Sequence, residues 1–319
     1  MNPGNFCLYS RTERADGIGF AICTPLCIMM HSMKRAVFIL ENKWRAASSA
    51  DAVEALGNYR DLGFEADLIY AGTELHSAGP AYDTLFITDS QRLLNQLAGK
   101  GAAVCAYRHS ANQGEDLSGA DYILMEPQWV DRDSLVKIWQ RQRGLPWTIL
   151  KTRRCVVREF VPEDLDAVYG LYDDLACHFL EPPSEDRKKE REILDSYIRR
   201  VYRLAGYGNW AVIDRESGGL AGRMGFSFPP GNWAGSAIDA VYGYLVHPGF
   251  RRQGIAAEVG RALLDYGFEQ LGFETIGADA SIFNSISDKI LKSFGFVSVA
   301  EEENQRYYIL NKKDWRNRL

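Results

Sequence analysis

The sequence has no uninterrupted apolar run of the about 18 residues that a membrane-spanning helix needs. Its six cysteines and five histidines form no Cys-x-x-Cys pair and no zinc-like spacing. The net charge is −5, so there is no positive excess for general nucleic-acid binding. These absences predict a cytoplasmic protein with reduced thiols, without a metal site and without a membrane or nucleic-acid partner.

The totals that are present are ordinary for a globular protein. The length of 319 residues suggests two domains, because a domain usually has ~100–200 residues. Hydrophobic residues make up 46% and charged residues 25%, which is enough apolar material for a core in each domain. The oligomeric state is left open by these totals.

The first 32 residues lack the regular patterning that starts at Arg35. Arg11 and Arg14 precede an apolar run from 18 to 30, which loosely imitates a signal peptide but is followed by no small-residue cleavage site. We therefore expect residues 1–32 to be a disordered extension, with Met33 as an alternative start of translation.

Residues 33–145 alternate between strand and helix patterns. Apolar runs of strand length occur at 36–40, 66–70, 84–88, 102–107 and 122–125, and helical spacing occurs at 50–62, from Asp89 to Gly99, and from Asp133 or Ser134 onward. Repeated strand–helix units predict a doubly wound, Rossmann-like parallel sheet with helices on both faces.

Thr88 at a strand end, followed by a helix, a glycine turn and a strand, resembles the haloacid-dehalogenase-like class. That class uses an aspartate nucleophile after the first strand, with a second Asp two residues later to help hold Mg²⁺. Here Glu41-Asn-Lys and Asp89-Ser-Gln follow the candidate strands, and no Walker or dinucleotide Gly-rich loop is present. We therefore expect a non-catalytic domain for packing or ligand sensing, with His76 and His109 in loops, and a hydrolase is disfavoured.

The segment 143–154 is the expected boundary, because Gly144 and Pro146 interrupt the pattern, and Trp147 suggests that the linker packs against protein. Residues 152–319 then predict a mixed-sheet α+β domain. Its strands are expected at 155–160, 210–214, 220–228, 238–246, 273–280 and 307–310, and its helices at 162–172, 185–204, after Gly254, and from Asn284 to Gly295. Ile193, Tyr197 and Tyr202 are expected on the buried side of the long helix.

The stretch 241–256 combines an apolar strand, a Pro/Gly turn, two arginines and a glycine that opens a helix. The free N–H groups of a helix's first turn and the helix dipole favour an anion at that position. Gly254 has no Cβ and permits close approach, and Arg251 and Arg252 can add charge-assisted hydrogen bonds. The pattern is typical of a pyrophosphate site.

These residues resemble the GCN5-related N-acetyltransferase family. The stretch Arg251-Arg252-Gln253-Gly254-Ile255-Ala256 is similar to the family's signature. A second set, made up of Asn284, Ser287, Gly295 and Phe296, is similar to the family's second half-motif. Arg158-Glu159 and 162–164 are similar to the family's first strand and helix. The resemblance covers roughly the C-terminal half. It implies transfer of an acetyl group from acetyl-CoA to a small-molecule amine or a protein N-terminus, without a metal.

The resemblance also implies the roles of individual residues. Leu245 or Val246 would polarise the thioester carbonyl through a backbone N–H. The six signature residues would anchor the pyrophosphate, and Asn284 would contact the pantetheine arm or an ordered water.

The proton-transfer groups depart from the family's usual pattern. The family's usual base position is Val241 here, so Asp239, two residues earlier on the same face, is the candidate base, acting directly or through a water. The family's usual tyrosine acid is Lys292 here, so Ser287 or solvent would protonate the leaving thiolate. Because both usual groups are missing, a regulatory protein that binds acyl-CoA without turnover is the alternative.

Overall fold

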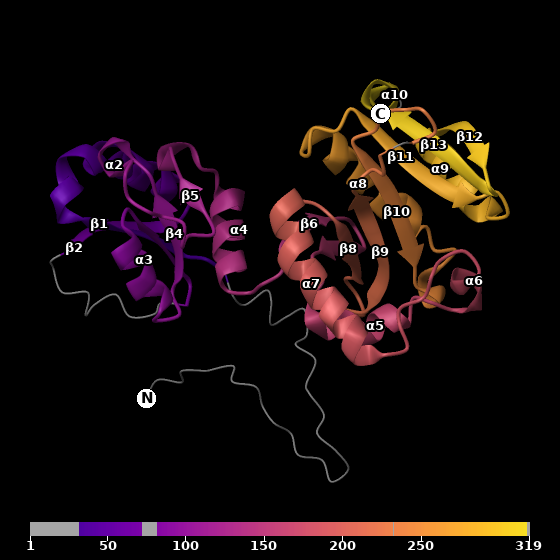
Figure 1. Cartoon of the computed structure of the whole chain (residues 1–319), viewed down its shortest axis with the longest axis horizontal. Helices are drawn as coiled ribbons and strands as arrows, with labels where there is room; N and C mark the ends of the chain where they lie inside the picture. Colours follow the sequence, from indigo (N-terminus) through magenta and orange to yellow (C-terminus); the bar gives the residue numbers. More distant parts are fainter. Residues whose placement is uncertain (1–31, 72–81, 232, 318–319) are drawn as a thin grey trace, which may run out of the picture. The chain divides into compact units, whose positions relative to one another are not determined.

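The computed structural model describes residues 32–71, 82–231 and 233–317, which fall into two compact units divided between Trp147 and Thr148 (Figure 1). The expectation of an N-terminal extension and the placement of His76 concern residues outside these ranges. Within the described residues, no helix combines the length and the apolar character needed to cross a membrane.

The N-terminal unit is built on a five-stranded parallel sheet in the order β2-β1-β3-β4-β5. Its strands are β1 (Arg35–Glu41), β2 (Glu65–Ala71), β3 (Thr84–Thr88), β4 (Ala103–Tyr107) and β5 (Ile123–Leu124). This order is that of flavodoxin-type sheets, with a topological switch point between β1 and β3. The expected parallel sheet is therefore present, and the resemblance to haloacid dehalogenases stays a prediction.

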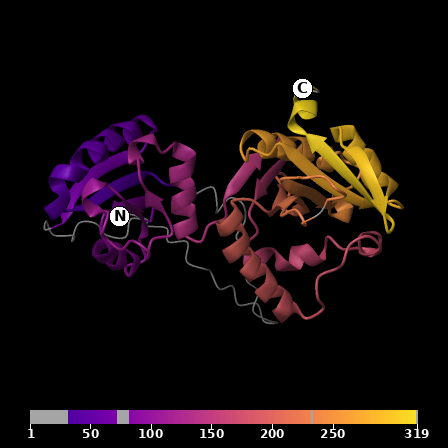
Figure 2. The ribbon, with the colours of Figure 1, turned by 45° about the horizontal axis from the view of Figure 1, so that its top comes forward.

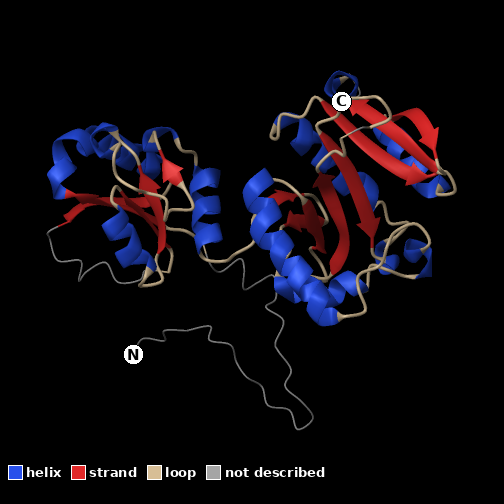
Figure 3. Ribbon diagram, viewed as in Figure 1, coloured by secondary structure: helices blue, strands red, loops and turns tan. Residues whose placement is uncertain are grey.

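Helices cover this sheet because its central strands are apolar on both sides. Phe38 and Leu40 of β1 pack in the cluster that contains residues of α2 (Arg45–Asp61) and α4 (Arg132–Gln142). Val37 and Ile39, which alternate with them, pack against α3 (Gln91–Ala98). The helices thus lie on opposite faces of the sheet (Figure 3).

Asp89 does not cap α3, because its side chain is buried at the end of the sheet. Its carboxylate accepts the Glu41 N–H at 2.8 Å and lies 3.3 Å from Nε2 of His109, and burial raises its pKa to about 7. The adjacent Ser90 caps the helix instead, accepting the Leu93 N–H. His109 is in a loop, as expected, but it is buried in this polar network.

The C-terminal unit is built on an eight-stranded mixed sheet in the order β12-β13-β11-β10-β9-β8-β7-β6. The strands are β6 (Thr148–Lys151), β7 (Cys155–Arg158), β8 (Asn209–Asp214), β9 (Leu220–Ser227), β10 (Ala240–Val246), β11 (Thr275–Ser281), β12 (Val297–Glu302) and β13 (Gln305–Asn311). β10 and β11 are parallel, and every other neighbouring pair is antiparallel.

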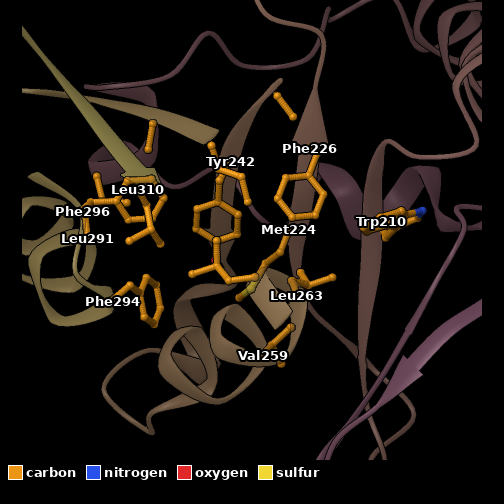
Figure 4. Packing of buried hydrophobic residues seen from close by; sticks show 14 of the residues in the cluster. Trp210, Met224, Phe226, Tyr242, Val259, Leu263, Leu291, Phe294, Phe296 and Leu310 are labelled. Carbon is orange, nitrogen blue, oxygen red and sulfur yellow. The ribbon is translucent and has the colours of Figure 1, made fainter. Parts of the chain in front are cut away.

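The larger core of this unit lies between the sheet and helices α8 (Ile255–Glu269) and α9 (Ser285–Phe294). Figure 4 shows the rings of Phe226 and Tyr242 directed toward Phe294, Val259 and Leu263. On the other face, Leu245 packs in a second cluster with residues around α5 (Leu165–Tyr169) and on α7 (Arg187–Ala205). Helices therefore cover both faces, as Figure 2 shows from a second side.

Local signals place the ends of the two C-terminal helices. Asn284 caps α9 by accepting the Ser287 N–H at 3.1 Å, and Gly295 ends it with φ 98°. Gly254 precedes α8 with φ 79°, a conformation that favours glycine. These three expectations are confirmed.

Four features differ from the expectation. The boundary segment contains β6, which pairs with β7, and β12 was not anticipated. Ile193 is 49% exposed, because α7 directs it to solvent rather than to the sheet. The short helix α6 (Asp174–Cys177) follows α5 in place of one continuous helix to residue 172.

Candidate functional site

Strands β10 and β11 separate after two paired positions. Only Ala240↔Ile276 and Val241↔Gly277 are in register, although β10 continues to Val246 and β11 to Ser281. On its other side, β10 stays paired with β9 as far as Val246↔Gly222. Within the described part of the chain, the second half of β10 therefore has one edge without a partner strand (Figure 1).

The register of β9 and β10 shows which backbone groups point into this gap. The His247 N–H donates to the Ala221 carbonyl, and alternate residues of an antiparallel strand face the same partner. Leu245 accordingly directs its N–H toward β9, whereas Tyr244 and Val246 direct theirs into the gap. Of the two residues expected to polarise a carbonyl, the geometry favours Val246.

The loop between β10 and α8 presents free backbone donors. Arg252 and Gly254 both have left-handed φ values, 61° and 79°. None of the backbone N–H groups from Gln253 to Ala257 donates to a protein acceptor in the described part of the chain, and Gly254 provides no side-chain cap. Consecutive unpaired N–H groups at a helix start form an anion site.

The two signature arginines are placed differently. Arg251 donates through Nη1 and Nη2 to Asp173, at 2.7 and 2.9 Å, and through Nε to the Val246 carbonyl at 3.1 Å. The hydrogen bonds from Arg251 hold the pKa of Asp173 at about 2. Arg252 is exposed and has no protein partner among the described residues. Free positive charge at the loop comes from Arg252, and the expected phosphate role of Arg251 stays a prediction.

Arg154 braces the same loop, which the sequence did not reveal. Its backbone N–H and Nε donate to Glu258 of α8 at 2.9 and 2.7 Å, and Nη1 donates to the Gln253 carbonyl at 2.6 Å. Burial alone would raise the pKa of Glu258, but the hydrogen bonds from Arg154 and Thr152 outweigh it and hold the pKa at about 2. The partners are 104 residues apart, and no local pattern links them.

The sheet face that carries Leu245 is called the α7 face below. By register and alternation it comprises Arg223 and Leu245, the residues Val241, Gly243 and Gly277, and the pair Asp279 and Tyr307. It includes the unpaired part of β10. The opposite face carries Tyr242, Met224 and Tyr308 in the core with α8 and α9.

Asp279 is a carboxylate on the α7 face that sequence reasoning missed. It lies on β11, two residues beyond the last paired position, and its side chain has no protein partner in the described residues. Solvent reaches the residue, yet the surrounding protein partly dehydrates the carboxyl and raises its pKa. The local sequence does not distinguish Asp279 from any other solvent-accessible residue of a strand, so only the strand register shows that it lies on this face.

Asp239 and Ser287, the expected proton-transfer residues, lie at opposite ends of this region. Oδ2 of Asp239 accepts the N–H groups of Glu274 and Thr275 at 2.8 and 2.9 Å, which fixes the start of β11. Ser287 accepts a hydrogen bond from the Tyr244 hydroxyl at 3.2 Å. Ser287 is therefore joined to the unpaired part of β10, whereas Asp239 is committed to the backbone.

The position where the resemblance implies a tyrosine acid holds an ion pair. Lys292 contacts Asp288 at 2.9 Å, and Asp288 also accepts from Arg306 and from the Tyr308 hydroxyl. Hydrogen bonds from Lys292 and Tyr308 outweigh the effect of burial and hold the pKa of Asp288 at about 2. No cluster of His, Cys, Asp and Glu that could hold a metal occurs in the described ranges.

Residues 154–297 match the family described as the acetyltransferase (GNAT) domain. These residues form an N-acetyltransferase domain of the GNAT family. The match begins at the bracing Arg154 and includes the phosphate-type loop, the gap beside β10, and Ser287. Enzymes of this family use acetyl-CoA as co-substrate and an amine as acceptor. The N-terminal unit lies outside the matched residues.

Two kinds of relatives cover the same part of the chain. The "Uncharacterized N-acetyltransferase YoaA" of Bacillus subtilis (strain 168) is 26% identical over 150 residues, which cover 46% of this chain and 82% of that protein. Solved acetyltransferases from Bacillus anthracis and Agrobacterium tumefaciens str. C58 are each 20% identical, with TM-scores of 0.42 and 0.43. Each covers 51% of this chain, and 98% and 94% of the respective solved chains are covered.

Proposed function

We propose that this protein transfers the acetyl group of acetyl-CoA to a primary amine by direct attack. The proposal rests above all on the free N–H groups from Gln253 to Ala257, placed at the start of α8 and directly after the unpaired end of β10. The diphosphate would bind these donors and Arg252. The pantetheine arm would then extend along the edge of β10, with the thioester oxygen accepting from the Val246 N–H.

The reaction needs a neutral amine and a protonated leaving group. Asp279, whose pKa is raised by partial burial, would take the proton of the ammonium, directly or through a water. The amine nitrogen then bonds to the thioester carbon as the carbon–sulfur bond breaks. The proton that the nitrogen loses passes to the thiolate through Ser287, whose hydroxyl is fixed by Tyr244, or through solvent.

Asp279→Asn tests the base assignment against the expectation for Asp239. We expect Asp279→Asn to lower kcat by roughly 100-fold or more, and to remove the fall in kcat/KM toward acid pH that a titrating base produces. Asp239→Asn is the matched control, since it removes a carboxylate that contacts the backbone. The measurement is thiol release from acetyl-CoA with an amine panel. Equal loss in both variants would reject Asp279 as the base.

A second candidate function is binding of acyl-CoA without turnover. It is favoured by one observation, the ion pair between Lys292 and Asp288 where an acid would be expected. The two functions differ in one measurement. A binder raises its melting temperature with acetyl-CoA but releases no thiol with any amine, whereas an enzyme does both.

A further inference from the structure

Arg223 is a half-buried cation in the middle of the α7 face. It lies on β9, paired with Ala211 on one side and Leu245 on the other, and both neighbours belong to the apolar cluster of that face. Its guanidinium lies over the Tyr172 ring, 5.9 Å from the centroid. This contact partly stabilises the charge without neutralising it.

No acidic group of the described residues pairs with Arg223, either by ion pair or by hydrogen bond. Three other arginines of the same unit contrast with it, because Arg154, Arg158 and Arg251 each hold a carboxylate at 2.7 Å. A partly buried charge without an anionic partner is costly in the free protein. A ligand anion would remove that cost, since the planar guanidinium binds a carboxylate through two parallel hydrogen bonds.

Arg223 and Asp279 flank the unpaired part of β10 on the same face. Arg223 pairs with Leu245, next to the expected position of the thioester. Asp279 lies two residues beyond Gly277, so an extension of the β10–β11 register would bring it level with Gly243. Arg223 and Asp279 are two strands apart, at least ~10 Å across the sheet because β10 and β11 separate beyond Gly277, and they are offset by ~7 Å along it. A cation and an anion that have no partner within the described residues thus lie on either side of the reaction position.

We infer that the acceptor is a small amino acid, whose amine is directed toward Asp279 and whose carboxylate is bound by Arg223. This inference rests on the proposed acetyltransferase function and narrows its substrate class. Arg223 is then a specificity-determining residue rather than a catalytic one, because it binds a part of the substrate that does not react.

The test compares amino acids with their carboxamides as acceptors, for several side chains and for α-, β- and γ-amino acids. Each pair differs only in the carboxylate. The amine of the carboxamide is less basic, so more of it is neutral near pH 7, and basicity alone would favour the carboxamide. Thiol release from acetyl-CoA is measured for the full-length protein and for the Arg223→Met and Arg223→Lys variants.

We expect the parent to use the best amino acid ~10–100-fold more efficiently than its carboxamide in kcat/KM, as the loss of one charge-assisted hydrogen bond implies. Arg223→Met keeps most of the side-chain length but removes the charge. It should reduce the kcat/KM ratio of amino acid to carboxamide to near one, while its activity on carboxamides persists. Arg223→Lys keeps part of the preference. The Tm shift with acetyl-CoA is unchanged in both variants, because Arg223 does not contact the phosphate loop.

Three results would overturn the inference while leaving the acetyltransferase function intact. The first is equal use of the amino acid and its carboxamide by the parent, and the second is a preference for the amino acid that survives in Arg223→Met. The third is a preference for succinyl-CoA over acetyl-CoA with neutral amines, which Arg223→Met abolishes. The last would assign Arg223 to an anionic acyl group. Absence of thiol release with every amine would instead reject the proposed function, and the inference with it.

Discussion

Replacing Gly254 with Glu should remove coenzyme binding and leave the fold intact. Gly254 has φ 79°, so any side chain costs about 1–2 kcal/mol of backbone strain. Among the described residues, a Cβ there would meet only Nη2 of Arg154, at 3.5 Å, which is an ordinary contact. The strain should therefore lower Tm by only a few degrees, at roughly 2–4 °C per kcal/mol for a unit of this size.

The effect on binding is much larger, because the new carboxylate would lie at the free N–H groups and would repel the diphosphate. Losing two charge-assisted hydrogen bonds, at about 1.5–3 kcal/mol each, raises the Kd on the order of 100-fold or more. At acetyl-CoA equal to 100 times the parent's Kd, the parent gains about 2.7 kcal/mol, and the variant gains about 0.4 kcal/mol.

The assay is thermal unfolding with and without acetyl-CoA. We expect a ligand-induced rise of roughly 5–10 °C for the parent and below about 2 °C for Gly254→Glu. Gly272→Glu is the matched control, since Gly272 also has a left-handed φ, 74°, with no atom near its Cβ position. If acetyl-CoA raised the Tm of Gly254→Glu as much as it raises that of the parent, the diphosphate would not bind at this loop.

Two further predictions concern stability. Gly260→Ala should destabilise the C-terminal unit by about 1–3 kcal/mol, because its Cβ would lie 2.5 Å from Cζ of Phe294 and 2.7 Å from the Tyr242 hydroxyl; Gly57→Ala, on α2 with open space, should be neutral or stabilising, and equal Tm changes would refute the packing argument. Glu258 has a folded pKa of about 2 against 4.5 ordinarily, so its contribution is present above pH 4.5 and is lost as the pH falls from there through about 2. Thermal scans from pH 6 to 2 should show a shallower fall in Tm for Glu258→Gln than for the parent, and parallel curves would contradict the linkage.

The parts of the fold that local chemistry determines could be read from the sequence. Asn284 and Gly295 bound α9 through cap geometry alone, and Gly254 precedes α8 because few other residues adopt its backbone conformation. These signals involve neighbours within a few residues, so the phosphate-type loop could be located before any tertiary contact was known.

The parts that depend on pairing between distant segments could not be read in this way. β12 was missed because most of its residues are exposed, so it lacks an apolar alternation. Asp279 and Arg223 become relevant only when the register of β9, β10 and β11 places them on one face. The sequence suggested a different role for Asp239 for a similar reason, since the N–H groups that donate to its carboxylate, at the start of β11, are remote in sequence.

The contact between Arg154 and Glu258 bears on how the two halves of this chain can be separated. Arg154 lies only a few residues after Trp147, where the first unit ends, and β6 lies between them. A cut after Arg154, placed to trim what looks like a linker, would remove the edge strand β6 together with Arg154 and would loosen the loop around Gly254. Shortened proteins meant to retain acetyl-CoA affinity should therefore start before Thr148.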